Sequence, residues 1–356
     1  MSKETVAILF GGRSSEHEIS CLSAGGVLSA IDQNKYEIVL IGITKFGTWV
    51  LVPKSHALSI VDGKLPEVPL DAPAVVADVA GLSVDGKSLN VDLVFPTLHG
   101  PYGEDGSIQG FLEIADIPYV GSGVLASAVA MDKSFAKPIF AAHGLKVADG
   151  FTVSAKQWTN EAAKFQSKAD QLGYPVFVKP ARGGSSRGTT KVKSASELPA
   201  AIAEAHKFDQ KALVETAISG LEIECAVLEI NGVPQASKVG QIKIDSKFEF
   251  YDFEAKYLDG ATDIIVPANI PESAANAIKA ASVAAFISLG CSGLARVDFF
   301  YTNSGEVIIN EINTMPGFTA TSVFPKMWAE TGKNYPEIVQ ALIDTAKERN
   351  NGVLGN

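Results

Sequence analysis

The side chains best suited to chemistry lie in one predicted β-hairpin, LARVDFF–YTNSGE–VIINEIN, at residues 294–313. Alternate residues of a strand face the same side, so Arg296 shares a face with Asp298, and Glu311 shares one with Asn313. A two-residue turn at Asn303-Ser304 would place Arg296 opposite Glu311, with Asp298 diagonal to Glu311 at roughly 7–8 Å. The other face has the apolar pattern of a core, with Val297, Phe299, Ile308 and Ile312.

Two carboxylates and a carboxamide are the hard oxygen ligands that suit Mg²⁺, which also binds the phosphates of a substrate. We therefore predict that Asp298, Glu311 and Asn313 are metal ligands. The alternative is a solvated hairpin face with a cross-strand Arg–Glu pair. A three-residue bulged turn would also change which residues face one another.

A glycine-rich segment, KPARGGSSRGTTKVK, follows the strand-like run YPVFV. Gly183 and Gly188 have the separation of a P-loop, but Thr189 stands where that motif requires lysine. Taken alone, the segment is compatible with a flexible turn between two strands. Lys179 before it and Lys133 in MDKSFAK are each compatible with surface lysines. Together with the backbone N–H groups of the loop and the metal face, they predict a triphosphate site.

Two glutamates bracket ISG, and a carboxylate at this place is suited to a ribose hydroxyl. These residues, Glu215 and Glu222, are equally compatible with solvated strand ends. His99, in TLHGPYGEDG, has a side chain suited to proton transfer near neutral pH, and a hydrogen-bonded loop histidine is the alternative.

The segment SSEHEIS resembles the start of a helix. Ser15 is predicted as the N-cap of a capping box with Glu18, which places Glu16 in the first turn, where the helix dipole stabilises a carboxylate. That structural role is sufficient unless this end of the sheet binds a ligand.

The elements that carry these residues alternate between strand-like and helix-like patterns over residues 5–120. VAILF, YEIVLIGI and VDLVFPTL predict strands, and residues 19–31 predict a helix, so we expect an α/β layer with a mostly parallel sheet. Ligands of such sheets bind at the carboxyl ends of the strands, here GGRSSEHE and HGPYGEDG. Residues 53–90 carry only a weak pattern.

Two further blocks follow. GSG at residues 121–123 precedes a predicted helix at 126–142, a second helix at 161–172 and the strands YPVFV and KALVE. The last block contains a long irregular stretch at residues 240–269, an Ala-rich helix at 273–289 and the hairpin. We predict three units, at residues 1–120, 121–215 and 216–356.

Composition narrows the classes of function. The 356 residues are 46% hydrophobic and 20% charged, an ordinary globular balance, and the formal net charge is −10. This acidity disfavours nucleic acid as a partner. Three cysteines, Cys21, Cys225 and Cys291, show no disulfide or zinc spacing. The sequence contains no run of the roughly 20 apolar residues that span a bilayer. We expect a cytoplasmic protein that does not bind membranes.

Taken in order, six motifs resemble the D-alanine–D-alanine ligases, which are ATP-grasp enzymes of peptidoglycan precursor synthesis. The resemblance extends from about residue 6 to 325 and rests on GGRSSEHEIS, HGPYGEDGSIQG, GSGVLASAVAMDK, KPARGGSS, FYDFEAKYL and ARVDFF…NEINTMPG. It implies an N-terminal α/β domain followed by a two-part ATP-grasp fold with antiparallel sheets. It also implies two D-alanine substrates, ATP, two Mg²⁺ with Mn²⁺ as an alternative, and a homodimer.

The resemblance implies a role for each matching residue. Asp298, Glu311 and Asn313 would hold the metal ions, and Arg296 with the N–H of Gly317 would stabilise an oxyanion. For ATP, the resemblance implies that Lys133 and Lys179 bind the phosphates and that Glu215 and Glu222 lie on the adenosine side. On the D-alanine side it implies Glu16 for the first ammonium, His99 near the first carboxylate, and Ser322 with Val323 for the second substrate.

Within the long irregular stretch, EAKY resembles a lid over the phosphates. Lys256 would contact ATP, and Tyr257 would form a hydrogen-bonded link with Ser185 and Glu16. Tyr257 favours D-alanine over D-lactate as the second substrate, because ligases for D-lactate lack it. The alternatives are a D-alanine–D-lactate or D-serine ligase, or another ATP-grasp carboxylate–amine ligase. Arg187 and Thr216 depart from the usual motif, and the motif gives no role for Arg187.

Overall fold

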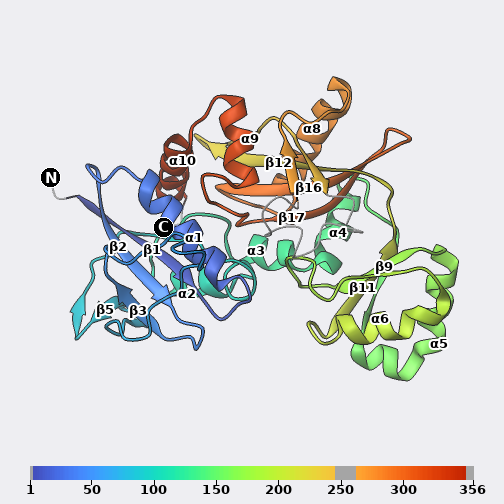
Figure 1. Ribbon diagram of the computed structural model, residues 1–356, viewed down its shortest axis with the longest axis horizontal. Coiled ribbons are helices and arrows are strands. Elements are labelled where there is room, and N and C mark those ends of the chain that lie inside the picture. The colour runs from blue at the N-terminus through green and yellow to red at the C-terminus, as the bar shows by residue number, and fades with distance from the viewer. Residues whose placement is uncertain (1–2, 245–261, 350–356) are drawn as a thin grey trace.

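The computed structural model describes residues 3–244 and 262–349. It is a mixed α/β fold in which a four-stranded, mostly parallel sheet is followed by a four-stranded and a six-stranded antiparallel sheet (Figure 1). The predicted fold class is therefore confirmed. No described helix combines the length and the apolar character needed to cross a bilayer.

The N-terminal sheet has the strand order β3-β2-β1-β7, and β1 pairs in parallel with both β2 and β7. VAILF and YEIVLIGI form its two central strands, as predicted. The weakly patterned stretch contains a small antiparallel sheet, β4-β5-β6. The elements are β1 Glu4–Gly11, α1 His17–Ala30, β2 Tyr36–Ile43, β3 Trp49–Val52, β4 Val76–Asp78, β5 Gly81–Val84, β6 Lys87–Ser88, β7 Leu93–Pro96 and α2 Ser107–Ile114.

The predicted capping box at the start of α1 is wrong. Glu16 itself occupies the N-cap position, and no side chain caps this end. The Ser14 hydroxyl accepts a hydrogen bond from the Glu16 N–H at 3.2 Å, just before the helix begins. This shift by one residue leaves the Glu16 carboxylate available for a contact outside the helix.

The predicted single helix over residues 126–142 is two helices, α3 Val124–Met131 and α4 Lys133–Ala142. Asp132 interrupts them with an extended backbone (φ −97°, ψ 97°) and caps α4 by accepting a hydrogen bond from the Ser134 N–H at 3.0 Å. As a result, Lys133 is the first residue of a helix.

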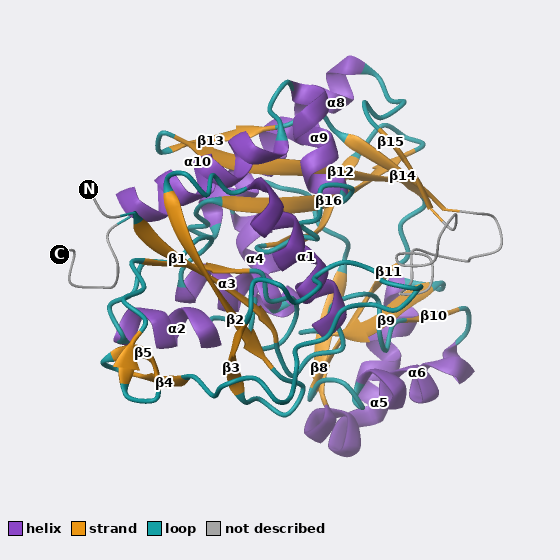
Figure 2. Cartoon of the chain, turned by 60° about the vertical axis from the view of Figure 1, so that its left-hand side comes forward, coloured by secondary structure: helices purple, strands orange, loops and turns teal. Residues whose placement is uncertain are grey.

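A four-stranded antiparallel sheet, β10-β9-β11-β8, forms the middle unit, and its apolar core lies against α5 and α6 (Figure 2). Helix α5 begins at a capping box made by Ser154 and Gln157. The elements are β8 Gly150–Ser154, α5 Ala155–Leu172, β9 Val176–Pro180, β10 Thr190–Val192, α6 Leu198–Ala205 and β11 Lys211–Thr216.

The third large sheet has the order β15-β14-β12-β16-β17, with β13 paired to β12. Its members are β12 Gly220–Ile230, β13 Val233–Ala236, β14 Gly240–Ile244, β15 Thr262–Ile265, β16 Leu294–Thr302 and β17 Val307–Asn313. The remaining helices are α8 Glu272–Ser288, which corresponds to the predicted Ala-rich helix, α9 Val323–Thr331 and α10 Tyr335–Glu348.

One apolar core joins elements from both ends of the described chain. Phe10 of β1 and Phe95 of β7 belong to the same cluster as Leu342 of α10, and all three side chains are fully buried. Figure 1 shows α10 beside α1 and β1. The middle unit has a separate core that includes Val178 and Val214.

Candidate active site

The hairpin β16–β17 forms one wall of the candidate site, with a register that differs from the prediction. Asp298 lies directly opposite Glu311, and Arg296 lies opposite Asn313, so the predicted Arg296–Glu311 pairing is wrong. The strands end at Thr302 and begin again at Val307, which makes the connection longer than two residues. A bulge then follows Asp298, because Phe299 pairs with Ile309 and not with Asn310.

The new register brings the two carboxylates closer together. The Arg296 guanidinium donates from Nε to Asp298 Oδ1 and from Nη2 to Asp298 Oδ2, each at 2.7 Å, and lies 3.1 Å from Glu224 Oε2. Asn313 Nδ2 donates to Asp298 Oδ2 at 3.0 Å. Three of the predicted metal and oxyanion residues, Arg296, Asp298 and Asn313, therefore form one contact network.

The two predicted phosphate lysines reach the same place from other units. Lys133 Nζ lies 2.9 Å from Glu311 Oε2 and donates to the Gly183 carbonyl at 2.9 Å. Burial alone would lower the pKa of Lys133, but the Glu311 charge raises it, so the ammonium keeps its proton. Lys179 Nζ donates to Asn310 Oδ1 at 3.1 Å and forms an ion pair with Glu215.

Glu215 is a buried anion between two cations. Besides Lys179, it pairs with Lys137 Nζ at 2.6 Å. Burial alone would raise the pKa of this carboxyl, yet the two ammonium groups hold it at about 2. Burial lowers the pKa of Lys137 in turn. Sequence reasoning missed Lys137, although it lies one helical turn after Lys133 and so shares its face.

A cavity of about 570 Å³ opens between the antiparallel sheets, which is large enough for a nucleotide. Seven predicted residues line it: Lys133, Lys179, Ser185, Glu215, Glu222, Asp298 and Glu311. The glycine loop (residues 181–189) contributes Ser185 and Arg187 to the lining. Lysine ammonium groups and backbone N–H groups at one end make this cavity suited to a polyanion.

Glu16 and Ser185 meet across two units. Ser185 Oγ donates to Glu16 Oε1 at 2.7 Å, although the residues are far apart in sequence. Ser185 has a positive φ of 52°, a strained conformation for serine that this contact holds in place. The other predicted members of this site in the long loop, Lys256 and Tyr257, lie outside the described residues.

His99 is buried and engaged on both ring nitrogens. Nδ1 faces the Met315 carbonyl at 3.0 Å and must carry the proton, so Nε2 accepts from Ser23 Oγ at 2.9 Å. Burial lowers the pKa of this imidazole, which favours the neutral form. His99 acts here as a link in the framework, and its place beside a substrate carboxylate stays a prediction.

Glu104 also bonds Met315, the residue whose carbonyl faces His99. Its carboxylate accepts from the Gly100 N–H at 2.8 Å and from the Met315 N–H at 3.3 Å. Met315 lies midway between Asn313 and Gly317, so His99 and Glu104 together fix the chain between them. Sequence reasoning missed Glu104, whose only signal was its place in HGPYGEDG.

The segment after β17 contains the remaining predicted residues. A Cβ added to Gly317 would lie 3.3 Å from Ser322 Oγ, so the two residues are adjacent. Ser322 Oγ accepts from the Thr319 N–H at 3.0 Å, and Val323 begins α9. The structure thus brings Gly317, Ser322 and Val323 together just beyond β17.

Comparisons with known proteins agree along the whole chain. Two protein families match, one described as D-ala D-ala ligase N-terminus over residues 5–122, the other as D-ala D-ala ligase C-terminus over residues 139–344. A D-alanine–D-alanine ligase of Arthrobacter sp. (strain FB24) is 49% identical, covering 99% of this chain and 96% of that protein. One from Mycolicibacterium smegmatis is 48% identical, with 98% and 96% covered.

Two solved structures resemble the fold closely. The VanG D-Ala:D-Ser ligase of Enterococcus faecalis superimposes with a TM-score of 0.86 at 39% identity, over 97% of this chain and 100% of that one. The D-alanine–D-alanine ligase of Coxiella burnetii has a TM-score of 0.82 at 35% identity, over 98% and 96%.

Proposed function

The chain belongs to the D-alanine–D-alanine ligase family, and from this we propose that it uses ATP to join two D-alanine molecules into D-alanyl-D-alanine. One observation carries the proposal at the level of the site. Two lysines, two facing carboxylates and a serine that contacts Glu16 line one nucleotide-sized cavity: Lys133, Lys179, Asp298, Glu311 and Ser185.

In the first step, a carboxylate oxygen of one D-alanine attacks the γ-phosphorus of ATP. The bond from that phosphorus to the β-phosphate oxygen breaks, which gives D-alanyl phosphate and ADP. Lys133 and Lys179 would bind the phosphate oxygens, because both ammonium groups line the cavity beside the hairpin. Glu16 would receive the ammonium of this first D-alanine.

The hairpin fits a divalent cation bound together with ATP. Among the described residues no three His, Cys, Asp or Glu side chains form a closed metal cage. The hairpin offers instead two facing carboxylates and one carboxamide, Asp298, Glu311 and Asn313, which suits Mg²⁺ completed by phosphate oxygens. When bound, the metal would neutralise charge on the phosphates.

In the second step, the amine of the second D-alanine attacks the acyl carbon, loses a proton, and phosphate leaves. Negative charge collects on the acyl oxygen, where Arg296 and the Gly317 N–H would stabilise it. Asp298 and Glu224 hold the Arg296 guanidinium in a fixed plane from two sides, which supports this role. Ser322 would bind the carboxylate of the second substrate. As in the family resemblance, we propose a cytoplasmic homodimer.

The test is phosphate release from ATP and Mg²⁺ with one amino or hydroxy acid at a time. D-alanine alone should support release and an equal amount of dipeptide, whereas L-alanine should support neither. D-serine or D-lactate added with D-alanine measures the choice of second substrate. Mixed product with D-serine in excess over D-alanyl-D-alanine would overturn the assignment in favour of a D-serine ligase.

A further inference from the structure

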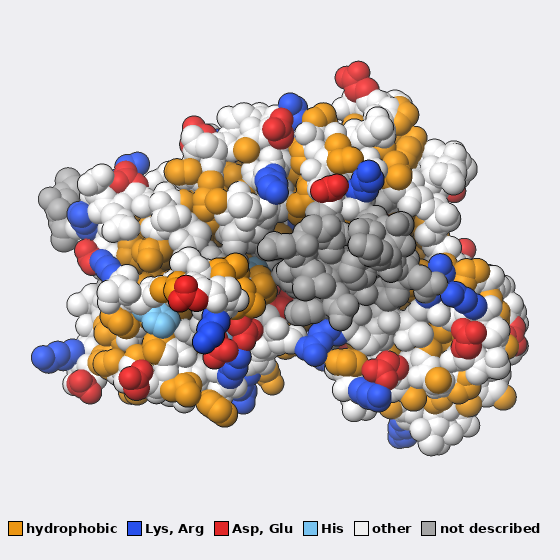
Figure 3. Space-filling model, viewed as in Figure 1, with side chains coloured by type: hydrophobic (Ala, Val, Ile, Leu, Met, Phe, Trp, Pro, Cys, Tyr) orange, Lys and Arg blue, Asp and Glu red, His pale blue; other side chains and the backbone are white. Residues whose placement is uncertain are grey.

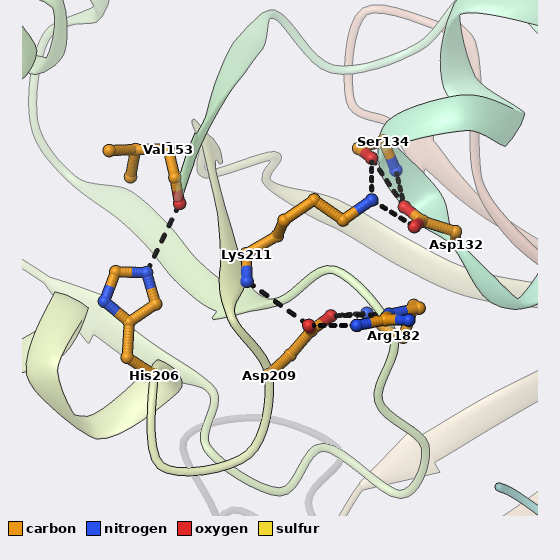
Figure 4. A network of polar contacts seen from close by, with 7 residues as sticks. All are labelled: Asp132, Ser134, Val153, Arg182, His206, Asp209 and Lys211. Atoms are coloured by element: carbon orange, nitrogen blue, oxygen red, sulfur yellow. Dashed lines mark hydrogen bonds and ion pairs between the residues drawn. The ribbon is translucent and has the colours of Figure 1, made fainter. Parts of the chain in front are cut away.

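The first residues of the glycine loop are held by a buried carboxylate, Asp209, that does not line the cavity. Asp209, 6% exposed, accepts hydrogen bonds from three nitrogens of Arg182: the backbone N–H at 2.8 Å, Nε at 3.2 Å and Nη2 at 2.8 Å (Figure 4). It also accepts from the Lys211 N–H at 3.2 Å. Burial alone would raise the pKa of Asp209, but the Arg182 bonds lower it.

Lys211 connects this anchor to a second carboxylate. Its Nζ forms an ion pair with Asp132 and lies 3.1 Å from Ser134 Oγ, while its carbonyl accepts from the Ala181 N–H at 2.9 Å. Figure 4 shows the Lys211 side chain extending from the Asp209 side of the network to Asp132. Asp132 caps α4, the helix that Lys133 begins.

Lys133, the first residue of α4, contacts the loop directly. Its backbone N–H donates to the Ala181 carbonyl at 3.0 Å, and its Nζ donates to the Gly183 carbonyl at 2.9 Å. Each of the first three loop residues is therefore held. Lys211 and Lys133 bond the Ala181 backbone, Asp209 bonds Arg182, and Lys133 bonds the Gly183 carbonyl. At its middle, the loop donates a hydrogen bond from Ser185 to Glu16.

Two cations of this network, Arg182 and Lys211, do not line the cavity. Arg182 does not line the cavity, although Gly183 to Arg187 of the same loop do. Its guanidinium is instead taken up by Asp209, and the Lys211 ammonium by Asp132. The Arg182–Asp209 and Lys211–Asp132 pairs thus fix backbone geometry, and none of these four side chains lines the cavity.

We propose that Asp209 is a positioning residue that anchors the glycine loop, and that Lys211 couples this anchor to Lys133. The anchor holds the loop N–H groups and Ser185 where ATP phosphates and the Glu16 contact require them. This inference rests on the proposed function, since it assigns the anchor to ATP binding and to the exclusion of water from the acyl phosphate.

The first experiment compares Asp209→Asn with the wild-type protein in steady-state kinetics. We expect the KM for ATP to rise about tenfold while kcat changes less than about threefold, because geometry and not chemistry is lost. Phosphate released per dipeptide should exceed one, because a loose loop admits water. Lys211→Met should act in the same direction. The matched control is Glu204→Gln, which removes an exposed pair with Lys207 and should change nothing.

A second readout needs no catalysis. Trypsin cleavage after the exposed Arg187, followed by mass spectrometry without nucleotide, should be about fivefold faster in Asp209→Asn than in wild type or Glu204→Gln. If Asp209→Asn fails to fold, Arg182→Gln provides the same comparison, because this side chain is 52% exposed.

The proposal that Asp209 anchors the loop would be overturned if folded variants kept the wild-type KM for ATP and the wild-type cleavage rate. A raised KM without faster cleavage would also overturn it. So would a fall in kcat and melting temperature with no change in KM or cleavage. If the wild-type protein released no phosphate with ATP and D-alanine, the proposed function would fail. The cleavage comparison would still decide whether Asp209 anchors the loop.

Discussion

Glu215 shows how one residue orders part of the cavity wall. Its carboxylate is buried between Lys137 and Lys179, and both ammonium groups hold its pKa far below the usual range. A carboxylate that stays ionised in a buried site keeps the two lysine side chains at fixed positions. Lys179, which also contacts Asn310, is thereby directed along the cavity wall.

Removing Lys137 tests this arrangement. Lys137→Met leaves a buried carboxylate with one cation in place of two, so we expect the free energy of unfolding to fall by about 3 kcal/mol. Urea denaturation at neutral pH measures the change. The control is Lys146→Met, which removes an exposed pair with Glu306 and should leave the denaturation midpoint unchanged. Equal midpoints for the two variants would contradict the structural role of Lys137.

At the scale of elements, strand parity in the hairpin was predictable, but its register was not. The alternation of side chains correctly places Arg296 and Asp298 on one face of β16. The length of the turn and the bulge at Asn310 depend on tertiary contacts, including the hydrogen bond from Lys179, and leave no local signature. For the same reason the sequence pattern predicts a continuous helix through Asp132, although the structure breaks there. The capping bond of Asp132 and its ion pair with Lys211 stabilise the break.

The segment between β17 and α9 depends on groups from the N-terminal unit. His99 and Glu104 hold the carbonyl and the N–H of Met315, and Ser23 in turn bonds His99. No hydrophobic pattern indicates such contacts. Sequence reasoning identified His99 by its chemistry and could not identify its partners. Ordered motifs located most of the candidate site, but pairwise contacts between distant units required coordinates.

The Glu104 contact predicts a pH dependence. Burial, and next the charge of Glu16, raise the pKa of Glu104 to about 8. The folded protein therefore binds a proton that the unfolded chain releases near its ordinary pKa of about 4.3. The stabilising contribution of this group is fully present below that value and is lost as the pH rises towards 8.

Glu104→Gln removes the titration while keeping the shape of the side chain. The wild-type protein should lose stability relative to this variant between pH 5 and about pH 8, measured as urea midpoints at each pH. Glu113→Gln is the control, because its carboxylate accepts from Tyr119 at the far end of α2 and has no contact with Met315. A constant difference across this range would exclude a raised pKa at Glu104.

At the scale of the whole molecule, the N-terminal sheet and the C-terminal helices share one core, and the middle unit has its own. The boundaries predicted at residues 120 and 215 stay predictions. Charged side chains of both signs are interspersed over the face shown in Figure 3, outside the grey atoms. That distribution is consistent with the acidic composition and gives no broad basic surface on the visible part of this face.

The shared core predicts coupled unfolding. Leu342→Ala in α10 should lower the free energy of unfolding by about 2–5 kcal/mol, since the side chain is fully buried. Three tryptophans report separately, in variants that keep one each: Trp49 in β3, Trp328 in α9 and Trp158 in α5. The urea midpoints seen by Trp49 and Trp328 should fall together, and that of Trp158 should move less. An unchanged Trp49 midpoint would show that the N-terminal sheet is independent of α10.

The place of α10 in the first core also sets an order of events during synthesis. Strand β1 leaves the ribosome early, but the apolar face it shares with Ile338, Leu342 and Ile343 is covered only after α10 emerges. At ordinary elongation speeds of about 5–20 residues per second, that interval is roughly 20–70 s. During this time the middle unit, with its separate core, is able to fold, whereas the N-terminal sheet exposes part of its apolar surface. Of these two parts of the chain, the N-terminal sheet is therefore the one whose apolar surface waits longest for its cover.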